Sequence, residues 1–113
     1  MATVRITNIT EEEIVFSDGQ RITFDHDPDC CELNYADFEQ LDDLARAYNF
    51  QLPLKFEAVN DYGFRFGDSC RMFFVPCYSY QNGYYTCEID IYYSGYADGN
   101  KPVLSFDAEF HEG

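Results

Sequence analysis

The sequence has few basic residues and no long apolar run. Seven lysine and arginine residues stand against 21 aspartate and glutamate residues, giving a formal net charge of −14. Because such a surface repels a phosphate backbone, we expect no direct binding of nucleic acid. No apolar stretch is long enough to cross a bilayer, and the first residues lack a basic segment followed by an apolar one. These absences predict a cytoplasmic protein without a membrane partner.

Residues that carry out catalysis are also scarce. The chain has only two histidines, no glycine-rich phosphate loop with its lysine, and no recognisable Ser-His-Asp arrangement. General-base catalysis uses histidine most often, so the sequence predicts a protein that is not an enzyme and holds no cofactor. Five cysteines form no disulfide framework, and reduced thiols agree with a cytoplasmic location.

The residues that are present can build one folded domain spanning residues 1–113. Hydrophobic residues make up 46% of the chain and aromatic residues 19%, which is enough for an ordinary buried core. The segment from Val4 to Ile9 alternates apolar and polar residues, as a half-buried strand does. Asp18-Gly19 lies between two β-rich segments and predicts a hairpin. The segments "LPLKFEAV" and "YGFRFGD", separated by Asn60-Asp61, predict two further strands.

One segment has the period of a helix. Between Tyr35 and Tyr48, apolar residues recur at intervals of three and four, which places them on a single helical face. The residues on that face are Phe38, Leu41, Leu44, Ala45 and Tyr48. The sequence therefore predicts one helix over residues 35–48 and no other.

The C-terminal half predicts sheet. "RMFFVPCYSY" and "YYTCEIDIYYSG" are joined through Asn82-Gly83, the strongest short-range hairpin signal. The resulting register predicts a core face and a solvent face, the latter including Phe73, Val75, Cys77 and Ser79. A last strand, "VLSFDAEF", is expected to place Leu104, Phe106, Ala108 and Phe110 on the core. Together these elements predict an α+β fold: a twisted antiparallel sheet of six to seven strands with a single helix packed on one face.

The stretch "HDPDCCE", His26 to Glu32, could be a metal or nucleophile site built from His26, Cys30, Cys31 and Glu32. Adjacent side chains diverge, so Cys30 and Cys31 form a poor chelate. The surrounding carboxylates would raise the pKa of a thiol and make it a weak nucleophile. We therefore interpret the stretch as a turn before a helix, and His26, Cys30 and Cys31 remain the weaker metal alternative.

A second alternative concerns the strand that carries Glu88 and Asp90. Both carboxylates would project from one strand face, about 6.6 Å apart by strand rise. Tyr84, Tyr92 and Phe73 would share that surface. Paired carboxylates beside aromatic rings are used in sugar hydrolysis. Binding of a glycan or another small ligand is therefore the alternative function.

Several segments resemble an uncharacterised family of short acidic proteins from gut bacteria and their phages. The similar segments are "FSDG", "HDPDCCELNYADF", "GFRFGD" and "FVPCYSYQNGYYTCEIDIYY". The resemblance implies no reaction, cofactor or catalytic residue. It implies a setting of mobile genetic elements, in which small acidic proteins are often inhibitors of host nucleases or other defence proteins.

Charge and resemblance lead to one functional hypothesis. Carboxylates about 6 to 7 Å apart along strands and helix turns could imitate a phosphate backbone and occupy a basic groove on a partner protein. Tyrosines could supply the buried anchors of such an interface. The candidate residues are Glu11, Glu12, Glu13, Asp37, Glu39, Asp43, Glu88, Asp90, Tyr84 and Tyr92. The sequence is compatible with either a monomer or a homo-oligomer.

Overall fold

Strands make up most of the protein. The computed structural model describes residues 2–25, 33–83, 86–95 and 101–112, of which 57% lie in strands and 7% in helical turns. The elements are β1 (Thr3–Val4), β2 (Ile6–Ile9), β3 (Glu13–Phe16), β4 (Arg21–Asp25), β5 (Leu33–Ala36), η1 (Phe38–Gln40), α1 (Leu44–Ala47), β6 (Phe50–Gln51), β7 (Lys55–Val59), β8 (Gly63–Gly67), β9 (Met72–Gln81), β10 (Glu88–Tyr93), β11 (Leu104–Asp107) and β12 (Glu109–Glu112).

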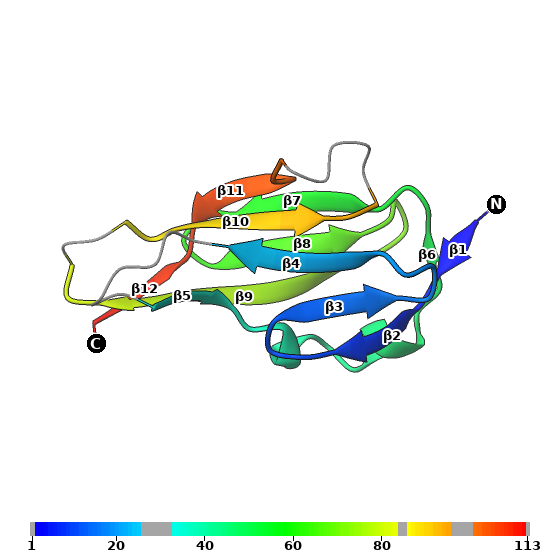
Figure 1. Cartoon of the computed structure of the whole chain (residues 1–113), viewed down its shortest axis with the longest axis horizontal. Coiled ribbons are helices and arrows are strands. Elements are labelled where there is room, and N and C mark those ends of the chain that lie inside the picture. The colour runs from blue at the N-terminus through cyan, green and yellow to red at the C-terminus, as the bar shows by residue number, and fades with distance from the viewer. Residues whose placement is uncertain (1, 26–32, 84–85, 96–100, 113) are drawn as a thin grey trace.

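The strands form two main sheets that pack face to face. The first sheet has the order β11-β10-β4-β3-β2. The second has the order β12-β9-β8-β7, and β5 also pairs with β9. A small third sheet pairs β1 with β6. In Figure 1 the first main sheet lies over the second, as in a β-sandwich.

The core lies between the two sheets because each sheet turns alternate side chains inward. The first sheet contributes Ile14 and Phe16, and the second contributes Phe64 and Phe66, all at most 1% exposed. The ring of Phe16 packs edge-on against Phe66 at 6.1 Å between centroids. One apolar cluster thus joins both sheets.

The hairpin predicted at Asp18-Gly19 and the two strands predicted on either side of Asn60-Asp61 are confirmed. β3 and β4 form an antiparallel hairpin, in which the N–H of Gly19 donates to the carbonyl of Phe16 at 2.9 Å. Gly19 has φ 87°, a value that glycine adopts without strain. β7 and β8 pair in the same way, and Asp61 in their turn has φ 72°. In both pairs the turn residues and the strand pattern specify the same local structure.

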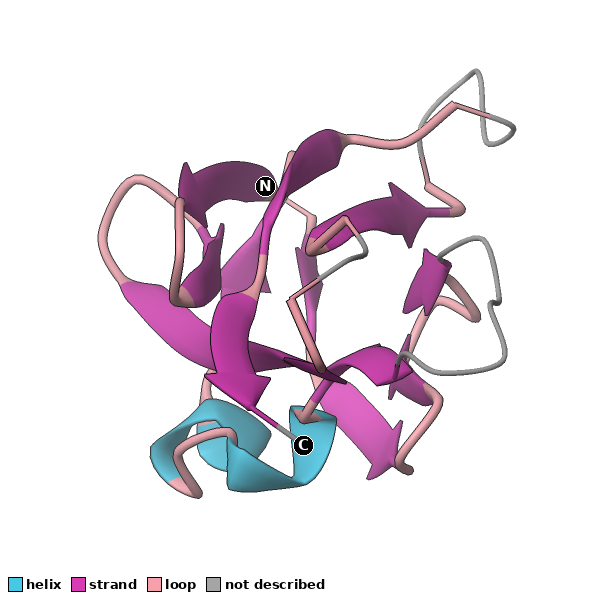
Figure 2. Cartoon of the chain, turned by 90° about the vertical axis from the view of Figure 1, so that its left-hand side faces the viewer, coloured by secondary structure: helices cyan, strands magenta, loops and turns pink. Residues whose placement is uncertain are grey.

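The predicted helix over residues 35–48 is wrong, and so is the α+β fold class. Tyr35 lies in β5, and only the short turns η1 and α1 follow. Leu41 is extended, with ψ 138°, and the carboxylate of Asp42 accepts a hydrogen bond from the N–H of Leu44, which competes with helix formation. Leu44 is 56% exposed. Figure 2 shows the helical turns together at one edge of the strands, so neither of them lies across a sheet.

The predicted hairpin between β9 and β10 is also wrong. Gly83 does adopt a turn conformation, with φ 96°. However, β9 pairs with β8, β5 and β12, whereas β10 pairs with β4 and β11. The two strands leave the turn into opposite sheets. The faces predicted for β9 are therefore exchanged: the buried side chains are Phe73, Val75, Cys77 and Ser79.

The predicted last strand is split between the two sheets. β11 pairs antiparallel with β10, and β12 pairs parallel with β9. Between them, the N–H of Ala108 donates to the carbonyl of Cys87 at 2.9 Å. Phe106 and Ala108 are buried as predicted, but Phe110 is 49% exposed. The segment therefore crosses from one sheet to the other. None of the helices in the described ranges has the length or apolar character to span a membrane.

Candidate functional site

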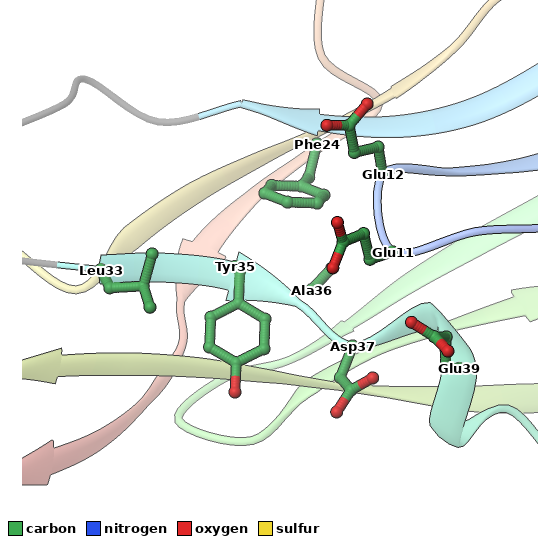
Figure 3. Close-up of a pocket in the computed structure, with 8 residues that line it drawn as sticks. All are labelled: Glu11, Glu12, Phe24, Leu33, Tyr35, Ala36, Asp37 and Glu39. Atoms are coloured by element: carbon green, nitrogen blue, oxygen red, sulfur yellow. The ribbon is translucent and has the colours of Figure 1, made fainter.

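A surface groove of about 440 Å³ lies beside β5 (Figure 3). Its lining comes from the β2–β3 turn, from the end of β4, and from β5 with the turn that follows it. The lining residues are Glu11, Glu12, Phe24, Leu33, Tyr35, Ala36, Asp37 and Glu39. The volume lies in the range of ordinary ligand sites, and acidic side chains flank an apolar and aromatic floor.

Local hydrogen bonds hold the acidic rims. In the β2–β3 turn, the hydroxyl oxygen of Thr10 accepts from the N–H groups of Glu12 and Glu13, each at 3.2 Å. At the end of β5, the N–H of Asp37 donates to the carbonyl of Pro76 at 2.9 Å. The side-chain amide of Gln40 donates to Asp37 Oδ2 at 2.6 Å. These bonds fix where the carboxylates project.

The groove carries uncompensated negative charge. Glu13, next to it, forms an ion pair with Arg21 at 3.0 Å. Among the described residues, no lysine, arginine or histidine forms an ion pair with Glu11, Glu12, Asp37 or Glu39. Four carboxylates without a cation create a local potential that attracts positive charge.

Tyr35 connects the groove to an aromatic cluster on the outer face of the second sheet. Its ring lies 6.2 Å from the ring of Tyr80 at an interplanar angle of 13°. His111 stacks on Tyr80 at 5.0 Å and 25°. β5 and β12 flank β9 on opposite sides, so Tyr80 is covered on both faces. Burial, followed by the neighbouring Tyr80 and Asp37, raises the pKa of Tyr35, which therefore stays neutral.

A buried polar network fixes the strand that forms the groove floor. The side-chain amide of Asn34, on β5, donates to the carbonyls of Thr86 and Glu88 at 3.1 and 3.2 Å. The hydroxyl of Ser79 donates to Asn34 Oδ1, and the amide of Gln81 donates to Ser79 Oγ at 2.8 Å. Asn34 and Ser79 are fully buried. The network joins β5 to β9 and to the segment before β10, so the position of the groove floor is rigidly defined.

The structure brings four of the predicted acidic residues together and separates the others. Glu11, Glu12, Asp37 and Glu39 all line the groove. The others lie elsewhere: Glu13 in its ion pair, Asp43 exposed and 3.9 Å from Arg46, and Glu88 and Asp90 on β10.

Glu88 and Asp90 belong to the first sheet. Asp107 is the register partner of Glu88, and Asp25 is a register partner of Asp90. The hydroxyl of Ser105 donates to Asp90 Oδ1 at 2.6 Å. Phe73, which was predicted to share this surface, is 3% exposed and lies in the core. Tyr92, on the same strand, is half-buried, and Tyr84 lies outside the described residues.

The predicted metal ligands His26, Cys30 and Cys31, with Glu32, also lie outside the described residues. Within the described ranges, no group of three or more histidine, cysteine, aspartate or glutamate residues could hold a metal ion. Cys77 is buried, and that burial, together with the Asp37 carboxylate, raises the pKa of its thiol. Cys77 therefore fills space in the core as a small apolar side chain.

Sequence reasoning missed the groove floor. Tyr35 fell inside the predicted helix, and Phe24 and Leu33 flank the "HDPDCCE" stretch, which was interpreted as a turn before that helix. The alternation in "LNYAD" was the available signal, because it places Leu33, Tyr35 and Asp37 on one face of a strand.

Comparisons with protein-family models, with characterised proteins and with solved structures gave no match. The resemblance to short acidic proteins of gut bacteria and phages therefore stays a prediction. The functional proposal depends on the chemistry of the groove.

Proposed function

We propose that the protein is a non-enzymatic binding protein that takes a basic segment of a partner protein into the groove. The observation that carries this proposal is a groove of about 440 Å³ lined by four carboxylates that form no ion pair with any cation of the described residues. Lysine and arginine place an apolar stem below a charged head. The stem would pack on Phe24 and Leu33, and the head would meet the acidic rims.

The rest of the surface supports a basic partner. The net charge of −14 would steer a cationic protein toward the molecule. On the first sheet, Glu88 lies opposite Asp107. Like charges placed directly opposite each other destabilise a sheet, and a cationic partner would relieve that repulsion. This surface is suited to a protein whose own ligand is a nucleic acid, such as a host nuclease or defence protein.

The glycan alternative has less support. Its expected aromatic partner, Phe73, lies in the core. In the exposed cluster, Tyr80 is covered by Tyr35 and His111. A stack of this kind does not offer the flat aromatic platform on which a sugar ring packs.

Binding of a labelled peptide that alternates lysine, arginine and glycine would test the proposal by fluorescence anisotropy. The double variant Glu11→Gln/Glu12→Gln removes one acidic rim. A matched control, Asp61→Asn/Glu112→Gln, removes the same charge at exposed positions outside the groove. We expect the groove variant to bind about tenfold more weakly than the control. Binding of the wild type should also weaken as salt is raised. Equal loss in both variants would refute the groove as the site.

Capture of partners from a host lysate, at low and then at high salt, would address the partner itself. A basic nucleic-acid-binding protein that is retained only at low salt is the expected result. If no basic protein is recovered under either condition, the proposed role as an inhibitor loses its support.

A further inference from the structure

We propose that the groove prefers arginine to lysine. This inference rests on the proposed function, because it names the side chain that the groove selects from a basic partner. It depends on two features on one side of β5: the Asp37 carboxylate is held in place, and the ring of Tyr35 projects on that same side.

The rims come from different parts of the chain. Glu11 and Glu12 belong to the β2–β3 turn, whereas Asp37 and Glu39 follow β5. Figure 3 shows Glu11 and Glu12 on one side of β5 and Asp37 on the other. A guanidinium presents five N–H donors in a planar fork, so it can donate to the Asp37 carboxylate while its plane lies along the ring of Tyr35. An ammonium is a compact point charge without a planar face that could stack on the ring.

Asp37 is prepared to accept such a bond. The Gln40 amide holds Oδ2 at 2.6 Å, which fixes the orientation of the carboxylate and leaves Oδ1 for a ligand. A preorganised acceptor loses less conformational freedom when it binds. The two lone pairs of Oδ1 match the directional donors of a guanidinium.

Tyr35 supplies the second element of selectivity. Tyr80 and Tyr78 hold its ring, with centroids at 6.2 and 5.6 Å, so the ring is ordered before any ligand arrives. Figure 3 shows the ring with one face turned to the viewer, over the β9 ribbon. A planar guanidinium stacks on such a face and gains both cation–π and packing energy. The Asp37 carboxylate and the ring thus favour the same planar cation.

Two peptides of equal length and charge, one alternating arginine with glycine and one alternating lysine with glycine, test the inference on the unaltered protein. We expect the arginine peptide to bind about three- to tenfold more tightly. Equal affinities would overturn arginine selectivity while leaving the proposed function intact. Failure of both peptides to bind would overturn both.

Variants separate stacking from a structural role of the ring. Tyr35→Leu should reduce affinity for the arginine peptide to the level of the lysine peptide and leave lysine binding unchanged. Tyr35→Phe keeps the ring and should keep the preference. Tyr62→Leu makes the same change at a 58% exposed tyrosine outside the groove and should have no effect. If Tyr35→Leu weakens both peptides equally, the ring only supports the groove wall and the inference is wrong.

Discussion

Replacing Asp68 tests whether one buried carboxylate holds the β8–β9 loop to the segment that contains Tyr48 and β6. Asp68 is 3% exposed and accepts hydrogen bonds from the Tyr48 hydroxyl and from the N–H groups of Gln51, Cys70 and Arg71, all at 2.9 to 3.0 Å. Burial alone would raise the pKa of Asp68. These hydrogen bonds outweigh the burial and hold the pKa below its ordinary value.

The expected cost follows from which bonds each substitution breaks. Asp68→Asn replaces Oδ2, which accepts from the N–H of Gln51, with an amide NH₂ group. The N–H of Gln51 then faces another donor and loses its acceptor. Such a loss costs about 2 kcal/mol, which lowers the melting temperature by about 8 °C in a domain of this size. Asp68→Ala leaves all of the donors without their acceptor, and we expect it to cost about 4 kcal/mol.

The dependence on pH has a defined sign. Because the folded pKa of Asp68 lies below the unfolded value of about 3.9, its stabilisation is complete above that value. It is lost as the pH falls through the lower folded pKa. The stability difference between the wild type and Asp68→Asn should therefore narrow in acid.

Urea denaturation at several pH values measures this difference. Asp43→Asn is the matched control, because it makes the same chemical change on a 99% exposed side chain, and it should alter stability by less than about 0.5 kcal/mol. The reasoning is refuted if Asp68→Asn is as stable as the control. A difference that stays constant from about pH 7 to about pH 3 would refute the assigned pKa direction.

Five further substitutions test the packing and the exposure of two thiols. Asn34→Ala removes the acceptor of the buried Ser79 hydroxyl and a donor to the carbonyls of Thr86 and Glu88, and it should cost about 2 to 3 kcal/mol in urea denaturation; an unchanged midpoint would show that the network is dispensable. Gly63→Ala places a Cβ on a backbone carbonyl of β9, and we expect little soluble folded protein. Gly19→Ala has open space and should cost only about 1 kcal/mol, so equal expression of the two would contradict the clash. Cys70→Ser should remove one thiol that reacts rapidly with a thiol reagent in the native protein, whereas Cys77→Ser should remove one that reacts only after unfolding.

The sequence predicted the parts of the fold that local chemistry decides. Asp18-Gly19 specifies a hairpin because the turn and both adjacent strands agree within a short segment. The β7–β8 pair follows the same logic around Asp61. In each case the pairing partner is the next strand in the chain, so no distant contact has to be known.

The predictions were wrong where contacts between distant parts of the chain determine the local structure. Asn82-Gly83 marks a turn correctly, but the pairing of β9 depends on β5, β8 and β12. Likewise, the three- and four-residue spacing after Tyr35 suits a helix in isolation. In the protein, pairing of β5 with β9 outweighs that preference, because it buries Ala36 and places Asn34 in its polar network.

The candidate site was half predictable. The net negative charge and the spacing of carboxylates along the chain identified Glu11, Glu12, Asp37 and Glu39 as binding candidates, and all four line the groove. Their separation from Glu88 and Asp90 could not be predicted, because it depends on which sheet each strand joins. The floor residues were missed for the same reason.

The division of the C-terminal segment between β11 and β12 affects how the chain can fold during synthesis. Residues 104–112 add an outer strand to each main sheet, and they leave the ribosome after every other described strand. Until they emerge, β10 lacks its antiparallel neighbour β11, and the second half of β9 lacks its parallel neighbour β12. Nascent chains would therefore hold unpaired strand edges, and a ribosome stalled shortly before this segment should carry a protease-sensitive chain that becomes resistant once residues 104–112 have emerged.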